Sequence, residues 1–80
     1  MMGKKKVFIP NCRKEVIDDV RFVICNPELK DGDIRLPQGK VIFKEVSSNE
    51  LELIKEEKVS EETTEKIKEY MESLGFKVKL

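Results

Sequence analysis

The two cysteines are the side chains of this sequence best suited to covalent chemistry, and they lie 13 residues apart at positions 12 and 25. Cys12 stands in a polar stretch directly before Arg13 and Lys14, and positive neighbours stabilise a thiolate. Cys25 ends the apolar run FVIC, where a cysteine usually packs as a small hydrophobe. Cys12 is therefore the candidate for a thiol-dependent redox activity, although the chain has no histidine to serve as its base. An inert loop cysteine is the alternative interpretation.

The spacing of the cysteines does not predict a disulfide. If residues 6–10 and 20–25 form a hairpin, Cys12 lies beside the loop and Cys25 at the far end of its strand, roughly 16 Å away at about 3.3 Å per residue. A disulfide requires Cα atoms within about 7 Å of each other. A parallel arrangement would bring the cysteines together, but it needs a longer connection than this sequence offers. We therefore predict two free thiols, as is usual in a reducing cytoplasm.

A cluster of basic residues flanks the first apolar run and contains no acidic residue: Lys4, Lys5, Lys6, Arg13 and Lys14. Such a cluster can bind an anionic surface, either nucleic-acid phosphates or an acidic patch of a protein. Residues 45–72, in contrast, carry ten acidic and four basic side chains, so the two regions attract each other within one molecule or between copies. We predict that the five basic residues form the partner-binding site. A solvated N-terminus, frayed over residues 1–5, is the alternative.

The overall composition favours a protein partner over nucleic acid. The net charge is zero, with no tryptophan and one tyrosine, whereas nucleic-acid-binding domains are usually basic and stack bases on exposed aromatic rings. A small regulator of the repressor or antitoxin type, using the basic flanks, is the second functional hypothesis.

Several kinds of catalytic chemistry lack the residues that they require. Histidine, the usual general base and the commonest zinc ligand, is absent. The glycine-rich phosphate loops are also missing, and the DGD segment at 31–33 lacks the remaining ligands of a calcium loop. A chain of 80 residues also has a thin core with little room for a pocket. We expect no metal and no cofactor, and a binding protein in preference to an enzyme.

The charged residues are mostly lysine and glutamate: lysine outnumbers arginine 13 to 3, and glutamate outnumbers aspartate 12 to 4. This enrichment is the compositional trend of hyperthermophile proteins. No apolar run approaches the roughly 20 residues of a membrane span, and the first residues lack the apolar core of a signal peptide. The sequence therefore predicts a cytoplasmic protein without a membrane partner.

Apolar periodicity predicts several short strands before a helix. The predicted strands cover residues 6–10, 20–26, 34–36 and 41–46. Residues 11–19 are expected to connect the first two of them. Residues 49–57 are ambiguous. A capping box at their start favours a helix, but the apolar stripe of that helix would consist of Leu51 and Ile54 alone. We therefore favour a strand.

The clearest element is an amphipathic helix over residues 60–74. Ser60 is a good N-cap, Gly75 is suited to the position after the helix, and residues 76–80 alternate as a final strand. The apolar stripe of the helix is formed by Ile67, Tyr70, Met71 and Leu74. The predicted fold is thus α+β in one domain over 1–80, with a small mixed or antiparallel sheet of 4–5 short strands and the helix packed on one face.

Together these features predict a small, non-catalytic binding or assembly module that acts through a charge-polarised surface. A thin core and several short strands are compatible with a homodimer, because a second copy can cover an open sheet face or edge.

Overall fold

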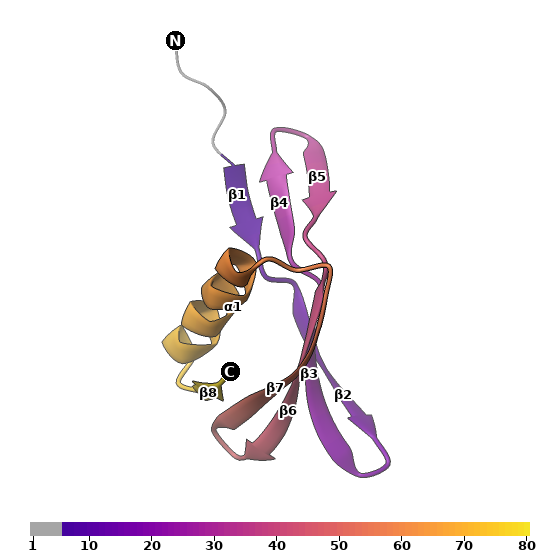
Figure 1. Ribbon diagram of the computed structural model, residues 1–80, viewed down its shortest axis with the longest axis vertical. Helices are drawn as coiled ribbons and strands as arrows, with labels where there is room; N and C mark the ends of the chain where they lie inside the picture. Colours follow the sequence, from indigo (N-terminus) through magenta and orange to yellow (C-terminus); the bar gives the residue numbers. More distant parts are fainter. Residues whose placement is uncertain (1–5) are drawn as a thin grey trace.

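The computed structural model describes residues 6–80 and shows an α+β fold, which confirms the predicted fold class (Figure 1). A five-stranded sheet, here called the main sheet, has the order β2-β3-β6-β7-β8, and a three-stranded sheet, the distal sheet, has the order β1-β4-β5. The elements are β1 (Lys6–Ile9), β2 (Cys12–Ile17), β3 (Val20–Cys25), β4 (Glu28–Asp31), β5 (Ile34–Pro37), β6 (Lys40–Ser47), β7 (Glu50–Glu57), α1 (Glu61–Ser73) and β8 (Lys77–Lys79). The expected fraying of residues 1–5 falls outside the described residues.

The two sheets are parts of one bent meander. The chain passes from β1 into β2, from β3 into β4 and from β5 into β6, so three long strands run through both sheets (Figure 1). Each of these strands carries a proline where it crosses, and a proline has no N–H with which to complete a ladder. These residues are Pro10, Pro27 and Pro37. The three prolines therefore lie together at the boundary where the meander divides into two sheets.

Backbone hydrogen bonds join the strands across this bend. The N–H of Asn26 donates to the carbonyl of Asn11 at 3.1 Å, and the N–H of Gln38 donates to the carbonyl of Pro27 at 2.8 Å. Asn11 has φ 50°, a left-handed conformation that asparagine tolerates better than most residues. These two hydrogen bonds thus still join the strands where the two ladders are interrupted.

The prediction of a connection over residues 11–19 is wrong. Residues 12–17 form β2, which pairs antiparallel with β3 in the register Cys12↔Cys25 to Ile17↔Val20. Asp18 and Asp19, with φ 51° and 64°, make a two-residue turn in which both residues have positive φ, as in type I′ hairpins. The strand was missed because CRKEVI is polar on both faces and because its turn lacks glycine. As a result, β1 pairs with β4 and not with β3.

The other strand predictions are confirmed. The ambiguous segment 49–57 forms β7, antiparallel to β6 with a bulge between Ile42 and Phe43. The final segment forms β8, which lies parallel to β7 and makes the main sheet mixed. β3 is an interior strand of the main sheet, between β2 and β6, and its last three residues are buried.

The helix has the predicted signals at both ends. The Ser60 side chain accepts a hydrogen bond from the N–H of Thr63 at 3.2 Å. Gly75 has φ 99°, and the N–H of Phe76 returns to the carbonyl of Met71 at 3.1 Å, which is the long-range bond of a Schellman motif. These caps end the helix where the sequence predicts.

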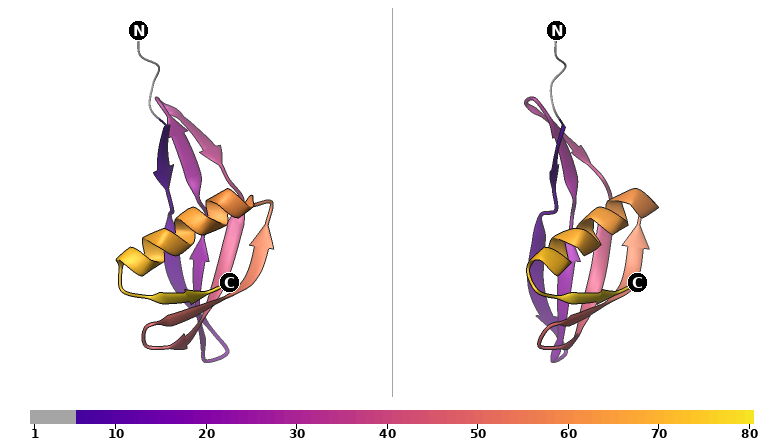
Figure 2. Two further views of the ribbon diagram at one scale, coloured as in Figure 1. Left: turned by 60° about the vertical axis from the view of Figure 1, so that its left-hand side comes forward. Right: turned by 90° about the vertical axis from the view of Figure 1, so that its left-hand side faces the viewer.

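The buried face of α1 differs in part from the predicted stripe. Tyr70 and Leu74 are exposed, whereas Thr63 and Thr64 are buried with the expected Ile67 and Met71. Figure 2 shows the reason: the helix crosses the main sheet obliquely, and its C-terminal turn reaches past the strand edge. The N-terminal half of α1 therefore packs on the sheet, and its last turn overhangs β2.

The core lies between the main sheet and α1, and the distal sheet contributes little to it. The buried cluster consists of Val23, Cys25, Val41, Phe43, Leu51, Ile67 and Met71. From the distal sheet only Phe8 packs against this cluster, and it does so as a partly buried residue. One helix thus covers one face of one sheet.

Substitution by alanine should destabilise the protein more at Gly39, where β5 crosses into β6, than at Gly75. Gly39 has φ 97°, and a Cβ at this position would overlap the backbone carbonyls of Glu57 and Lys58, whereas Gly75 with φ 99° has open space around it. We expect Gly75→Ala to cost about 1–2 kcal/mol through backbone strain alone. Gly39→Ala adds an overpacking cost of about 1–3 kcal/mol. Urea unfolding monitored by circular dichroism measures both, and equal losses would contradict the close packing at Gly39.

Candidate functional site

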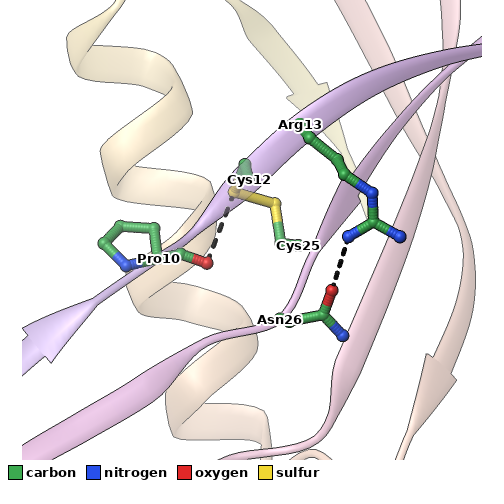
Figure 3. The surroundings of a disulfide bond; sticks show 5 residues. All are labelled: Pro10, Cys12, Arg13, Cys25 and Asn26. Carbon is green, nitrogen blue, oxygen red and sulfur yellow. Dashed lines mark hydrogen bonds between the residues drawn. A yellow bond between two sulfur atoms is a disulfide. The ribbon is translucent and has the colours of Figure 1, made fainter.

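The two cysteines form a disulfide, so the prediction of two free thiols is wrong (Figure 3). Cys12 and Cys25 are directly paired in the β2–β3 ladder, with Cα atoms 4.0 Å apart. The predicted separation assumed that Cys12 lies in a loop, whereas its place at the start of β2 sets it opposite Cys25. Cys12 is therefore present as half of a disulfide and not as a nucleophilic thiol.

The two sulfur-bearing residues differ in their surroundings. Cys25 is completely buried, while Cys12 is only partly buried. The Cys12 sulfur lies 3.6 Å from the carbonyl oxygen of Pro10 at the bend (Figure 3). Cys12 also lines a surface hollow of about 160 Å³, together with Arg13, Lys14, Tyr70, Leu74 and Phe76. The overhanging last turn of α1 thus forms one wall beside the disulfide.

The predicted basic site is spread over the molecule. Lys6 belongs to β1 of the distal sheet, Arg13 and Lys14 belong to β2 of the main sheet, and Lys4 and Lys5 lie outside the described residues. Neighbouring residues of a strand point to opposite faces, so Lys14 shares the face of Cys12 and Arg13 takes the other. The three described bases are therefore not gathered into one patch.

Arg13 is engaged by its own neighbours. Its Nε lies 2.8 Å from a carboxylate oxygen of Glu15, and its Nη1 donates to Oδ1 of Asn26 at 2.7 Å (Figure 3). These contacts hold the guanidinium beside the bend and pair its charge with that of Glu15. Lys14 carries the unneutralised positive charge of this part of β2, since none of the ion pairs within residues 6–80 includes it.

An acidic hollow of about 500 Å³ lies at the N-terminal end of α1. It is lined by Leu53, Glu56, Glu61, Glu62, Thr64, Glu65 and Leu80. The Thr64 hydroxyl donates to Glu56 at 2.8 Å, and Glu62 pairs with Lys66 at 3.6 Å. Within residues 6–80 no group of three or more Asp, Glu, Cys or His is placed to hold a metal ion.

The distal sheet carries a row of apolar side chains across all three of its strands. Phe8, Leu29 and Leu36 are directly opposite one another, and Ile34 lies on the same face. Lys66 of α1 lies with its Nζ 5.5 Å from the centroid of the Phe8 ring, which identifies this face as the one toward the helix. We call these four apolar residues the distal face. Ile34 is 61% exposed and Leu36 is 39% exposed.

The uncovered face of the main sheet is different in character. Its apolar residues are flanked in register by charges: Glu15, Phe22 and Lys44 are aligned, as are Arg13, Ile24, Ile42 and Lys55. On the distal face, in contrast, the aligned row of Phe8, Leu29 and Leu36 contains no charge, and the charges of Lys6 and Asp31 lie in the neighbouring row with Ile34. Sequence reasoning missed this surface because the three residues belong to three separate strands and align only after the meander has formed.

The chain has no significant match among protein-family models, curated proteins or solved structures. No helix within residues 6–80 is long and apolar enough to cross a membrane.

The disulfide predicts a measurable dependence of stability on reduction. Closing a loop of this size reduces the entropy of the unfolded chain, and a 15-residue loop is worth about 3 kcal/mol. We expect a phosphine reductant to lower the free energy of unfolding by about that amount, measured by urea unfolding. The double variant Cys12→Ala/Cys25→Ala serves as the control, because its unfolding should not respond to the reductant. Equal midpoints for the oxidised and reduced protein would contradict the expectation.

Proposed function

We propose that this protein is a non-catalytic assembly module that binds a second copy of itself through the distal face. The observation that carries the proposal is the exposed part of the distal face: Leu36 and Ile34 are exposed, while Phe8 at the other end of the row packs against the core.

The exposed apolar area supplies the driving force for association. A three-stranded sheet is stable only when an apolar face is packed against something. The main sheet meets this need with α1, while the distal sheet leaves Ile34 and Leu36 exposed. Burying apolar surface contributes about 25 cal/mol per Å², so covering these side chains in two copies at once favours a dimer.

The charges beside the distal face are self-complementary, which supports a second copy as the occupant. Lys6 and Asp31 are directly opposite each other in the β1–β4 ladder, next to the apolar row. A two-fold axis through the row lets Lys6 of one copy approach Asp31 of the other, as an isologous interface requires. The net charge of zero adds no general repulsion between copies.

The sequence-predicted basic residues divide between this surface and the rest of the molecule. Lys6 opens β1 beside the distal face, and Lys4 and Lys5 directly precede it in the sequence. The pairing of Lys6 with Asp31 between copies gives the contact a charged component. Association is therefore expected to weaken with added salt while keeping its apolar component.

The test is the molar mass in solution of matched variants, measured by light scattering after gel filtration and by sedimentation. We expect the unaltered chain to form a dimer and Leu36→Lys to be monomeric, because the lysine would bury an unpaired charge in the apolar contact. Val16→Lys is the control, since Val16 is 66% exposed on the edge strand of the other sheet. This variant should remain dimeric.

Two results would contradict self-association through the distal face. A chain that stays monomeric throughout the micromolar range, or a Leu36→Lys variant that still dimerises, contradicts the distal face as the interface. If the monomer instead binds a labelled duplex in a salt-dependent manner, and neutralising Lys4, Lys5 and Lys6 abolishes that binding, the regulator hypothesis takes its place.

A further inference from the structure

We infer that the hollow beside Cys12 is a thiol–disulfide exchange site that takes a small thiol bearing a carboxylate. The site lies in the main sheet, away from the distal face, and does not depend on self-association.

Access to the disulfide is one-sided. Cys25 exposes none of its surface, whereas Cys12 is partly exposed and lines the hollow. A thiolate that enters the hollow therefore reaches Cys12 and not the buried Cys25. Since the attacking sulfur approaches along the S–S axis, Cys25 is the leaving group.

The hollow selects the size and the charge of the incoming thiol. At about 160 Å³ it is smaller than the roughly 300–1,000 Å³ of sites that enclose a whole drug-sized ligand, so it admits one group of side-chain size. Tyr70, Leu74 and Phe76 offer apolar contacts to a methylene group. Lys14 offers the positive charge, because Arg13 is already paired with Glu15 at 2.8 Å.

The exchange balances with the thiol as reductant. The first thiolate attacks the sulfur of Cys12, forming a mixed disulfide, while the Cys12–Cys25 bond breaks and its electron pair leaves on the sulfur of Cys25, which takes up a proton. A second thiolate then attacks the small-molecule sulfur of the mixed disulfide and releases Cys12. Two thiols are oxidised to one disulfide, and the protein gains two electrons and two protons as Cys12 and Cys25 thiols.

The surroundings of the two cysteines can hold them in place after the disulfide is reduced. The carbonyl of Pro10, 3.6 Å from the Cys12 sulfur, can accept a hydrogen bond from the Cys12 thiol. The β2–β3 ladder continues for five further residue pairs beyond the cysteines and holds the two thiols opposite each other. Re-formation of the bond therefore needs no rearrangement of the chain.

The first test compares the rate of reduction by glutathione, which carries carboxylates, with that by uncharged 2-mercaptoethanol. In the unaltered chain the rate should rise linearly with either thiol, because the attack occurs on the folded protein. A rate that levels off at the unfolding rate would overturn the inference, because the disulfide would then be a structural cross-link reached only after unfolding.

Lys14→Glu is the variant that tests selectivity. We expect it to lower the glutathione rate by about fivefold or more, the effect of one removed charge contact at close range, and to leave the 2-mercaptoethanol rate unchanged. Lys30→Glu, which makes the same charge change in β4 of the distal sheet, should affect neither rate. Equal effects of Lys14→Glu on both thiols, or no effect at all, would contradict the assignment.

The position of the mixed disulfide gives a separate readout that requires no variant. Brief reaction of the unaltered chain with glutathione, rapid alkylation in denaturant and peptide mapping should place glutathione on Cys12 and the alkyl group on Cys25. Glutathione on Cys25, or on both cysteines equally, would overturn the proposed direction of attack.

Discussion

The in-register pairing of β2 with β3 is the constraint on which the rest of the structure depends. A two-residue turn at Asp18 and Asp19 sets this register, and the register places Cys12 opposite Cys25. The covalent link then lies at the inner end of the hairpin, beside the bend where Asn26 donates to the carbonyl of Asn11. A shift of β2 by one residue would turn Cys12 from the helix side to the other face of the sheet and remove the link to Cys25, whose face is also set by the pairing of β3 with β6.

The division of the meander into two sheets follows from the same region. Prolines at three crossings prevent the ladders from running straight through, and the single helix is long enough to cover the main sheet only. The main sheet therefore has a buried core around Phe43 and Ile67, while the distal sheet keeps Ile34 and Leu36 at the surface. The buried core of the main sheet and the exposed apolar residues of the distal sheet thus both follow from the bend between the two sheets.

The oblique course of α1 across the main sheet places the last turn of the helix beside the disulfide. Because α1 runs obliquely, Tyr70 and Leu74 leave the core and form a wall beside Cys12. These residues have the spacing of a core stripe, and the periodicity of the helix cannot tell where the sheet beneath it ends. The hollow thus forms because the apolar stripe of α1 continues beyond the edge of the main sheet.

The sequence by itself determined the elements whose signals are local. The caps at Ser60 and Gly75, the alternation in the strands and the composition suffice for an α+β fold with its helix and last strand in place. Only the tertiary structure decided which strands pair. The partner of a strand depends on register and on turn geometry over the whole meander, and β2, polar on both faces, carries no strong pattern of its own. For that reason the disulfide, the row through Phe8, Leu29 and Leu36, and the separation of the basic residues became visible only once the strands were assembled.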